Sequence, residues 1–419
     1  MSTRRIFLKS SAMAMVGIGS TPLWLSRALY AADAPSPRKK ILVAIFQRGA
    51  VDGLNVVIPH GEQAYYDLRP TIAIPRPNNS ADAAIDLDGF FGLHPSLAPL
   101  KPIYDAGHLA IVEAAGSPDP TRSHFDAQDF MESGTPGLKF TEDGWLNRAL
   151  QEEDLRHNQE HTAFRAVALG SQVPRTLAGK IPAIALSNLS NFAVGGKGPN
   201  PSPAASAFEA MYGQSGDQIL HATGEETFEA VKMLKDANPA QYKPAAGIEY
   251  PNNEFGNSMK QIAQLLKSNI GVEAAFTDVG GWDTHQNQGG VNGQLADRLR
   301  EFSSAISAFW RDMGDDAENI TLVTMSEFGR TARQNGTGGT DHGHANAMFV
   351  LGGTVKGGKV YGRWPGLNND QLNEGRDLAV TTDFRQVLGE AVAKSIGAKN
   401  LDMVFPGAQL RSDKFLRIV

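Results

Sequence analysis

Residues 40–53 read KILVAIFQRGAVDG, a short apolar run that passes directly into a polar loop. Apolar runs of this length without alternation are typical of strands that are buried on both faces of a parallel sheet. The pattern returns at residues 319–330, NITLVTMSEFGR, and longer helical patterns lie between such runs. Strands that alternate with helices predict an α/β fold, a three-layer sandwich with a mostly parallel central sheet.

The same reading predicts seven strands and six helices. The expected strands are Lys40–Phe46, Leu109–Ala114, Phe164–Leu169, Ile181–Leu186, Val272–Thr277, Asn319–Met325 and Ala347–Leu351. The expected helices are Leu97–Tyr104, Phe125–Glu132, Gly144–Glu152, Ser258–Ser268, Leu295–Met313 and Phe384–Ile396. Proline, glycine and serine loosen the pattern at about residues 190–255, which predicts an insertion or lid with one helix, Glu225–Leu234.

The first 34 residues predict an export leader. Arg4 and Arg5, the apolar run Ala12–Leu25 and the cleavage pattern at Ala32–Ala34 together match a twin-arginine signal peptide. The apolar run is shorter than the roughly 20 residues that a membrane-spanning helix needs, so we expect no stable membrane anchor. Residues 35–419 would then be one domain, carried folded by the twin-arginine translocase and periplasmic or secreted.

The amino-acid composition excludes several classes of protein and of site. The chain has 419 residues, 41% of them hydrophobic and 20% charged, which excludes a disordered protein. Its formal net charge of −6 argues against a nucleic-acid partner, because nucleic acids are bound by basic surfaces. The chain has no cysteine, so a transition-metal site must use histidine, aspartate and glutamate.

Polar loops follow the predicted strands, where ligands bind in open parallel sheets. They read QRGAVDG from residue 47, PTRSHFD from residue 120, DVGGWDTH from residue 278, SEFGR from residue 326 and TDHGH from residue 340. Four of the ten histidines fall in these loops, namely His124, His285, His342 and His344. We therefore expect a site at this edge of the sheet.

Five segments carry a family resemblance: RGAVDGLN, SHFDAQDF, GGWDTHQNQ, SEFGRT and TDHGHAN. The chain resembles the twin-arginine-exported family called domain of unknown function 1501 over essentially its whole mature length. That family is similar to the superfamily of alkaline phosphatases, sulfatases and phosphopentomutases. The resemblance implies an exported hydrolase that acts on a small-molecule or polymer ester of phosphate or sulfate, with a hydroxyl nucleophile beside bound metal ions.

The resemblance assigns catalytic roles to three residues. Ser123, at the start of a predicted helix, matches the nucleophile, because a helix N-terminus stabilises negative charge on its oxygen. Arg48 and Arg122 are candidate oxyanion clamps. Alternatively, Ser123 only caps the helix, with Asp126 completing the capping arrangement.

The metal ligands can be matched in two registers. In one, Asp341-His342-Gly343-His344 resembles the Asp-His-x-His of alkaline phosphatases, but the third histidine expected downstream is absent. In the other, which we prefer, Ser326-Glu327-Phe328-Gly329 replaces Ser-Asp-His-Gly, and His342 is the late histidine.

The preferred register leaves at most one well-formed site for zinc, manganese or calcium. That site would hold His285 and His342 with Asp283 or Asp278. At the second site, Arg48 occupies the position where an aspartate is expected, and Asp52 would have to take the place of that aspartate. Across both registers the candidate ligands are Asp52, Asp278, Asp283, His285, Glu327, Asp341, His342 and His344.

A structural reading competes with this one. Arg48, Arg122 and Arg330 would then pair with Asp52, Asp126 and Glu327, or Arg48 would pair with Glu327 and fill the second site. The protein would be a catalytically silent periplasmic binding or assembly protein with a degenerate metal centre. A pocket of about 300 Å³ or larger that contains Ser123 and His342 would favour the enzyme instead.

Overall fold

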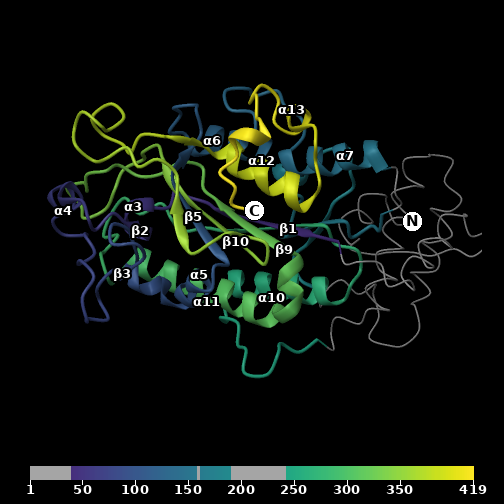
Figure 1. The fold of residues 1–419 in the computed structure, drawn as a ribbon, viewed down its shortest axis with the longest axis horizontal. Coiled ribbons are helices and arrows are strands. Elements are labelled where there is room, and N and C mark those ends of the chain that lie inside the picture. Colours follow the sequence, from purple (N-terminus) through teal and green to yellow (C-terminus); the bar gives the residue numbers. More distant parts are fainter. Residues whose placement is uncertain (1–38, 158–160, 190–241) are drawn as a thin grey trace, which may run out of the picture.

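A nine-stranded sheet lies at the centre of the molecule (Figure 1). The computed structural model describes residues 39–157, 161–189 and 242–419. The strand order is β11-β5-β10-β9-β1-β8-β6-β7, and β12 also pairs with β5. The strands are β1 (Ile41–Gln47), β5 (Leu109–Gly116), β6 (Ala166–Leu169), β7 (Ile184–Leu186), β8 (Ala274–Val279), β9 (Ile320–Met325), β10 (Asn346–Gly352), β11 (Lys359–Tyr361) and β12 (Thr382–Asp383). In this sheet only β10 pairs antiparallel with its neighbours, so the described sheet is mostly parallel.

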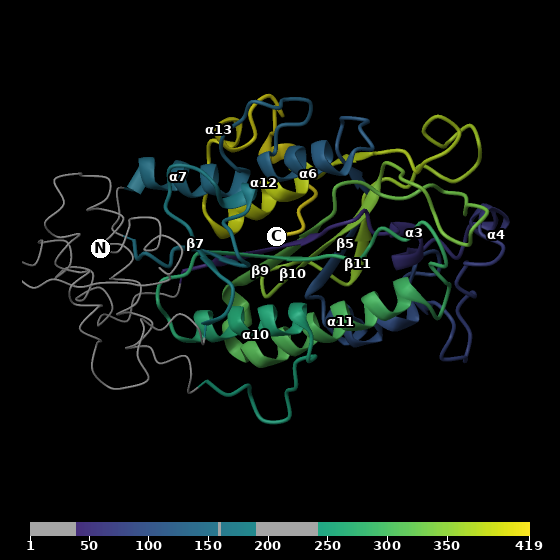
Figure 2. The same cartoon turned by 180° about the vertical axis from the view of Figure 1, so that it is seen from behind.

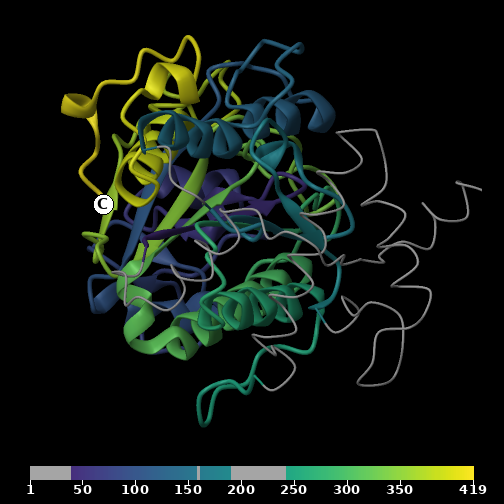
Figure 3. The same cartoon turned by 90° about the vertical axis from the view of Figure 1, so that its right-hand side faces the viewer.

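Helices cover both faces of the sheet, as the views in Figures 2 and 3 show. One layer contains the 3₁₀ helix η1 (Pro95–Leu100), α5 (Lys101–Asp105), α10 (Glu254–Lys267) and α11 (Gln294–Met313). The other contains α6 (His124–Ser133), α7 (Trp145–His157), α12 (Phe384–Ser395) and α13 (Leu401–Val404). Side chains of β1 alternate between the two cores, with Val43 and Ile45 in one and Leu42, Ala44 and Phe46 in the other. The predicted three-layer α/β sandwich is confirmed.

The elements missed by the sequence reading are short. A three-stranded sheet is formed by β2 (Val57–Ile58), β4 (Gly92–Leu93) and β3 (Ile85–Asp86), and two helices, α3 (Gly53–Val56) and α4 (Gln63–Leu68), lie near it. Elements of two to six residues are too short to establish a hydrophobic period. The helix predicted at Leu97–Tyr104 is divided between η1 and α5, where Pro99 and Pro102 donate no backbone hydrogen bond.

Some predicted segments lie outside the described residues. They are the leader at 1–34, the helix Glu225–Leu234 and residues 190–241 of the insertion. The end of the predicted insertion is described, and Asp312 of α11 holds it by accepting hydrogen bonds from the Tyr250 hydroxyl at 2.7 Å and the Ala245 amide at 2.9 Å. Within the described ranges, no helix combines the length and the apolar character needed to cross a membrane.

Glu113 in β5 is a buried carboxyl group that opposes the stability of the fold. Both its oxygens are buried and receive no well-formed hydrogen bond from the described residues, and burial raises its pKa well above the ordinary value of 4.5, although the backbone amide of Ala114 favours the charged form. Above about pH 4.5 the Glu113 carboxyl group is ionised in the unfolded chain but stays protonated in the folded chain, so the free energy of unfolding falls as the pH rises. We expect Glu113→Met to raise the free energy of unfolding by about 1–3 kcal/mol at pH 8, and by less at pH 4.

Urea unfolding at the two pH values measures this difference. Glu301→Met, on an exposed position of α11, is the matched control and should change little at either pH. A Glu113→Met protein that is less stable than the wild type at pH 8 would show that the carboxyl group has a stabilising partner.

Candidate metal centre

Three histidines and one aspartate meet at the carboxyl edge of the sheet. His124 is the first residue of α6, Asp283 and His285 follow β8, and His342 lies in the loop between β9 and β10. The Nε2 atom of His342 lies 3.0 Å from Nε2 of His124, 2.9 Å from Nε2 of His285 and 3.2 Å from Oδ1 of Asp283. The predicted convergence of these strand-end loops is therefore present in the structure.

The outer nitrogen of each ring has its own acceptor. Nδ1 of His124 donates to Glu327 Oε1 at 2.8 Å, and Nδ1 of His285 donates to Asp341 Oδ1 at 3.1 Å. Nδ1 of His342 donates to the carbonyl oxygen of Arg122 at 3.0 Å. Carboxylate and carbonyl oxygens only accept, so these bonds assign the proton of each neutral ring to Nδ1. In the neutral rings each Nε2 then carries the lone pair, and Nε2 of His342 contacts Nε2 of His124 and of His285.

Burial and charge act differently on two of these rings. Hydrogen bonding to the Glu327 carboxylate raises the pKa of His124 above 6.5. Burial, together with the charge of His124, lowers the pKa of His342. Burial of Glu327 opposes its ionisation, yet hydrogen bonds from His124 and Gln128 hold the pKa of Glu327 below its ordinary value. The lowered pKa of His342 favours its neutral form, in which Nε2 carries a lone pair that can coordinate a metal.

Arg330 fixes the aspartate of the cluster. Its side chain is fully buried, and Nη1 donates to Asp283 Oδ1 at 2.6 Å while Nε donates to Thr340 Oγ1 at 3.2 Å. Although burial opposes ionisation, the contacts with Arg330 hold the pKa of Asp283 below its ordinary value. Oδ1 of Asp283 also lies 3.0 Å from Nε2 of His285, so this anionic oxygen faces the histidines.

The donor set fits a divalent cation. Two ligand atoms on a tetrahedral zinc ion, each about 2.0–2.1 Å from it, lie about 3.3 Å apart. Ligand atoms of His124, Asp283 and His342 lie within 4.8 Å of one another, and Nε2 of His285 contacts both Asp283 and His342. Each histidine is also held from behind by an acceptor, as is usual for metal-bound imidazoles. The ligand atoms of all four residues do not lie within that distance of one another, so in this geometry a single ion would be held by three of them, His124, Asp283 and His342.

Ser123 stands beside this cluster as the N-cap of α6. Its hydroxyl accepts a weak hydrogen bond from the Asp126 amide at 3.5 Å, so the capping contact is present. Arg122, the residue before it, supplies the carbonyl oxygen that accepts from Nδ1 of His342, and the residue after it is His124. Ser123 is exposed, so its oxygen is accessible beside the cluster as well as acting as a cap.

The two predicted oxyanion clamps already have carboxylate partners. Arg48 lies 2.5 Å from Asp278 and 2.9 Å from Glu132, and Arg122 lies 2.5 Å from Asp377 and 2.8 Å from Glu374. The pairings of the structural reading are wrong, because Asp126 pairs instead with Lys139, and Arg330 pairs with Asp283.

Five predicted ligands lie outside the inner cluster. Glu327 and Asp341 stand behind His124 and His285, and Asp278 pairs with Arg48. Nε2 of His344 donates to the carbonyl oxygen of Ser117 at 2.9 Å. Asp52 is fully buried in a bidentate pair with Arg69, at 2.6 and 2.8 Å. In this structure these side chains make hydrogen bonds and ion pairs, while Asp283, His285 and His342 form the cluster.

Two residues of the centre were not among the predicted site residues. The available signal for His124 is its place among the four histidines in strand-end loops. For Arg330 the sequence suggests only a pairing with Glu327. Because Gly49, Gln128, His124 and Ser326 all donate to Glu327, this carboxylate is fully occupied, and Arg330 binds Asp283.

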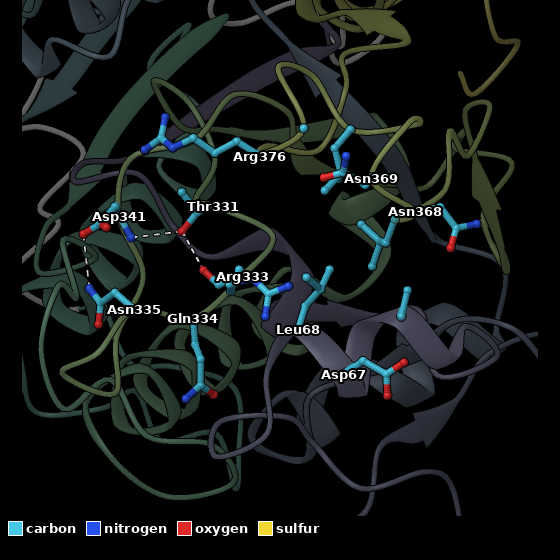
Figure 4. A pocket seen from close by; sticks show the side chains of 14 residues that line it. Asp67, Leu68, Thr331, Arg333, Gln334, Asn335, Asp341, Asn368, Asn369 and Arg376 are labelled. Carbon is cyan, nitrogen blue, oxygen red and sulfur yellow. Dashed lines mark hydrogen bonds between the residues drawn. The ribbon is translucent and has the colours of Figure 1, made fainter.

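A cavity of about 450 Å³ adjoins the centre (Figure 4). Its lining includes Asp341, whose carboxylate binds His285, and Arg376, whose Nη2 donates to the carbonyl oxygen of His342 at 2.8 Å. Ser123 and His342 do not line it, so it differs from the pocket expected from the sequence.

Solved structures with a similar arrangement include members of the enzyme classes named above. The lipoteichoic acid synthase LtaP from Listeria monocytogenes matches at 9% identity and a TM-score of 0.31, over 75% of this chain and 60% of its own. A mutant of the alkaline phosphatase PafA matches at 10% identity and a TM-score of 0.33, over 71% and 64%. The PsFucS1 sulfatase from Pseudoalteromonas sp. matches at 11% identity and a TM-score of 0.35, over 92% and 74%. Similarity this low says nothing about the reaction.

Sequence comparison gives a firmer result. No curated protein matches this sequence. Residues 107–403 match the family model described as "Protein of unknown function (DUF1501)". This match extends from β5 through α12 and includes His124, Asp283, His285 and His342. The predicted family is therefore confirmed over residues 107–403, which do not include the RGAVDGLN segment, and the chain belongs to the DUF1501 family.

Proposed function

We propose that this protein is an exported hydrolase that cleaves phosphate or sulfate esters with one bound divalent metal and Ser123 as nucleophile. One observation supports it most: ligand atoms of His124, Asp283 and His342 lie within 4.8 Å of one another, and the Nδ1 hydrogen bonds of the two histidines leave Nε2 of each to bind a cation. Lone pairs this close repel one another unless a cation or proton lies between them. A metal ion bound by these three residues would remove that repulsion.

The residue types favour zinc or manganese over calcium. Imidazole nitrogen suits transition metals, whereas calcium takes six to eight oxygen ligands. His124, His342 and Asp283 would hold the ion, with His285 beside them, and the ion would polarise an ester oxygen and stabilise a deprotonated hydroxyl. Glu327, which the resemblance would assign to a second metal, instead accepts hydrogen bonds from Gly49, His124 and Gln128, which supports a single site.

The remaining chemistry would belong to Ser123. Its oxygen would bond to phosphorus or sulfur as the bond to the leaving oxygen breaks, and water would then release the serine ester. The free amides at the start of α6 stabilise negative charge on the transferred group. Delivery of the folded chain by the twin-arginine translocase to the periplasm, with a cleaved leader, is part of the proposal.

A catalytically silent binding protein is the second candidate. It is favoured by the pairing of Arg48 and Arg122 with carboxylates, which leaves neither guanidinium free to clamp a substrate anion. Such a protein would hold the metal without turning over esters.

Metal content and turnover together test the proposal. Protein exported through its own pathway should contain about one transition-metal ion per chain. It should hydrolyse p-nitrophenyl phosphate or sulfate, lose activity with a chelator and regain it with metal. Metal without turnover would identify the binding protein. Turnover that survives Ser123→Ala would remove the serine from the mechanism, and protein that neither contains nor takes up metal would refute both readings of the centre.

A further inference from the structure

The cavity beside the centre is built from three parts of the chain. Figure 4 shows α4, the segment around residues 331–341 and the loop around residues 367–376 on its sides. Asp341 and Arg376 belong both to this lining and to the contacts behind His285 and His342. A molecule in the cavity would therefore lie against the residues that support His285 and His342 from behind.

The walls of the cavity are fixed by buried contacts. Arg69, which follows α4, donates to the carbonyl oxygens of Thr331 and Ala332, each at 2.9 Å. The Ala332 amide donates to the carbonyl oxygen of Arg376 at 3.0 Å, and Gln334 binds Thr71 through both ends of its amide. A cavity whose walls are already joined loses little entropy when a ligand binds.

Several polar groups in the lining have bonding capacity to spare. Arg333, Asn368 and Asn369 are exposed, and their side chains make no hydrogen bond to another described residue. Asp67 binds only Gln63, at 2.9 Å. Amides both donate and accept, as hydroxyl groups do, and guanidinium groups add preference for a ligand that carries negative charge.

The apolar part of the lining is aliphatic. It consists of Ala64, Leu68, Leu367 and Leu372, and no aromatic side chain contributes to it. A nucleotide base would lack a ring to stack on, and an acyl chain would leave the polar groups unpaired. A sugar ring presents C–H groups to aliphatic side chains and hydroxyl groups to amides.

We propose that this cavity binds the saccharide part of a sugar phosphate or sugar sulfate whose ester group lies at the metal centre. The inference rests on the proposed function for the position of the ester. It concerns different residues, chiefly Arg333, Asn368 and Asn369.

Calorimetric titration of the full-length, metal-loaded protein tests this assignment. The probes are glucose 6-phosphate and glucose 6-sulfate, each compared with inorganic phosphate or sulfate. We expect each sugar ester to bind more tightly than its inorganic anion. Arg333→Ala and Asn369→Ala should each weaken sugar-ester binding about ten-fold and leave inorganic-anion binding unchanged. Arg411→Ala, an exposed arginine paired with Asp413, is the matched control and should have no effect.

The outcomes separate this inference from the hydrolase proposal. Sugar esters that bind no more tightly than the inorganic anions, or that bind Arg333→Ala as well as the wild type, would overturn the assignment of the cavity. Binding that depends on Arg333 without any ester hydrolysis would support the cavity and contradict the hydrolase. Hydrolysis of p-nitrophenyl esters without sugar binding would contradict the cavity alone.

Discussion

The variant His342→Ala is expected to lose its metal and, with it, all ester hydrolysis. His342 occupies the middle of the cluster, with Nε2 within 3.2 Å of His124, His285 and Asp283. Loss of an outer hydrogen-bond partner alone usually costs 10- to 100-fold in metal affinity, so we expect loss of this central ligand to cost more than about 100-fold. Metal titration monitored by calorimetry, with cobalt(II) absorption as a second signal, measures the change.

His344→Ala provides the control two residues away. His344 uses Nε2 to bind the carbonyl oxygen of Ser117, so its removal should leave metal affinity within a few-fold of the wild type. The pair of variants also separates the two registers of the Asp341–His344 motif. Equal losses for both variants would place both histidines on the metal and refute the arrangement described here.

The sheet could be predicted because its strands are buried on both faces. Runs such as Leu109–Gly116 contain few polar residues, and the helices between them bury every third or fourth residue, as Leu295, Leu299 and Phe302 of α11 do. The reversed direction of β10 could not be predicted, because an apolar run has the same pattern in either direction. The register of its neighbours, Met348 with Val112 and Val350 with Val323, depends on tertiary pairing.

The edge of the sheet that carries the site could be predicted as well, because parallel strands end together. The sequence could not predict which polar residue of each loop faces the site. His342 and His344 lie four and two residues before β10 in the same loop, yet only His342 joins the cluster. The partners of charged residues were equally hidden: Arg69 lies in a segment without a recognisable motif, and it takes the carboxylate of Asp52.

Removal of that carboxylate is the mutation with the largest expected effect on stability. Both side chains of the Asp52–Arg69 pair are almost fully buried, and Gln288 Nε2 adds a third hydrogen bond to Asp52 at 2.6 Å. Asp52→Ala would leave the Arg69 guanidinium buried with only neutral acceptors. An uncompensated buried charge of this kind typically costs about 3–5 kcal/mol.

Urea unfolding of chelator-treated protein measures this loss without the stabilisation that bound metal adds. Asp297→Ala removes an exposed carboxylate paired with Arg300 on α11, and it should cost no more than about 1 kcal/mol. The experiment also decides what Asp52 does. If Asp52 were a metal ligand, its carboxylate would not serve to neutralise Arg69. Asp52→Ala would then lower the metal content and leave the metal-free protein as stable as the wild type. We expect instead that the metal-free variant is less stable than the wild type and that the metal content is unchanged. Arg69 also donates to the carbonyl oxygens of Thr331 and Ala332, so loss of the Asp52–Arg69 pair would loosen the wall between the sheet and the cavity.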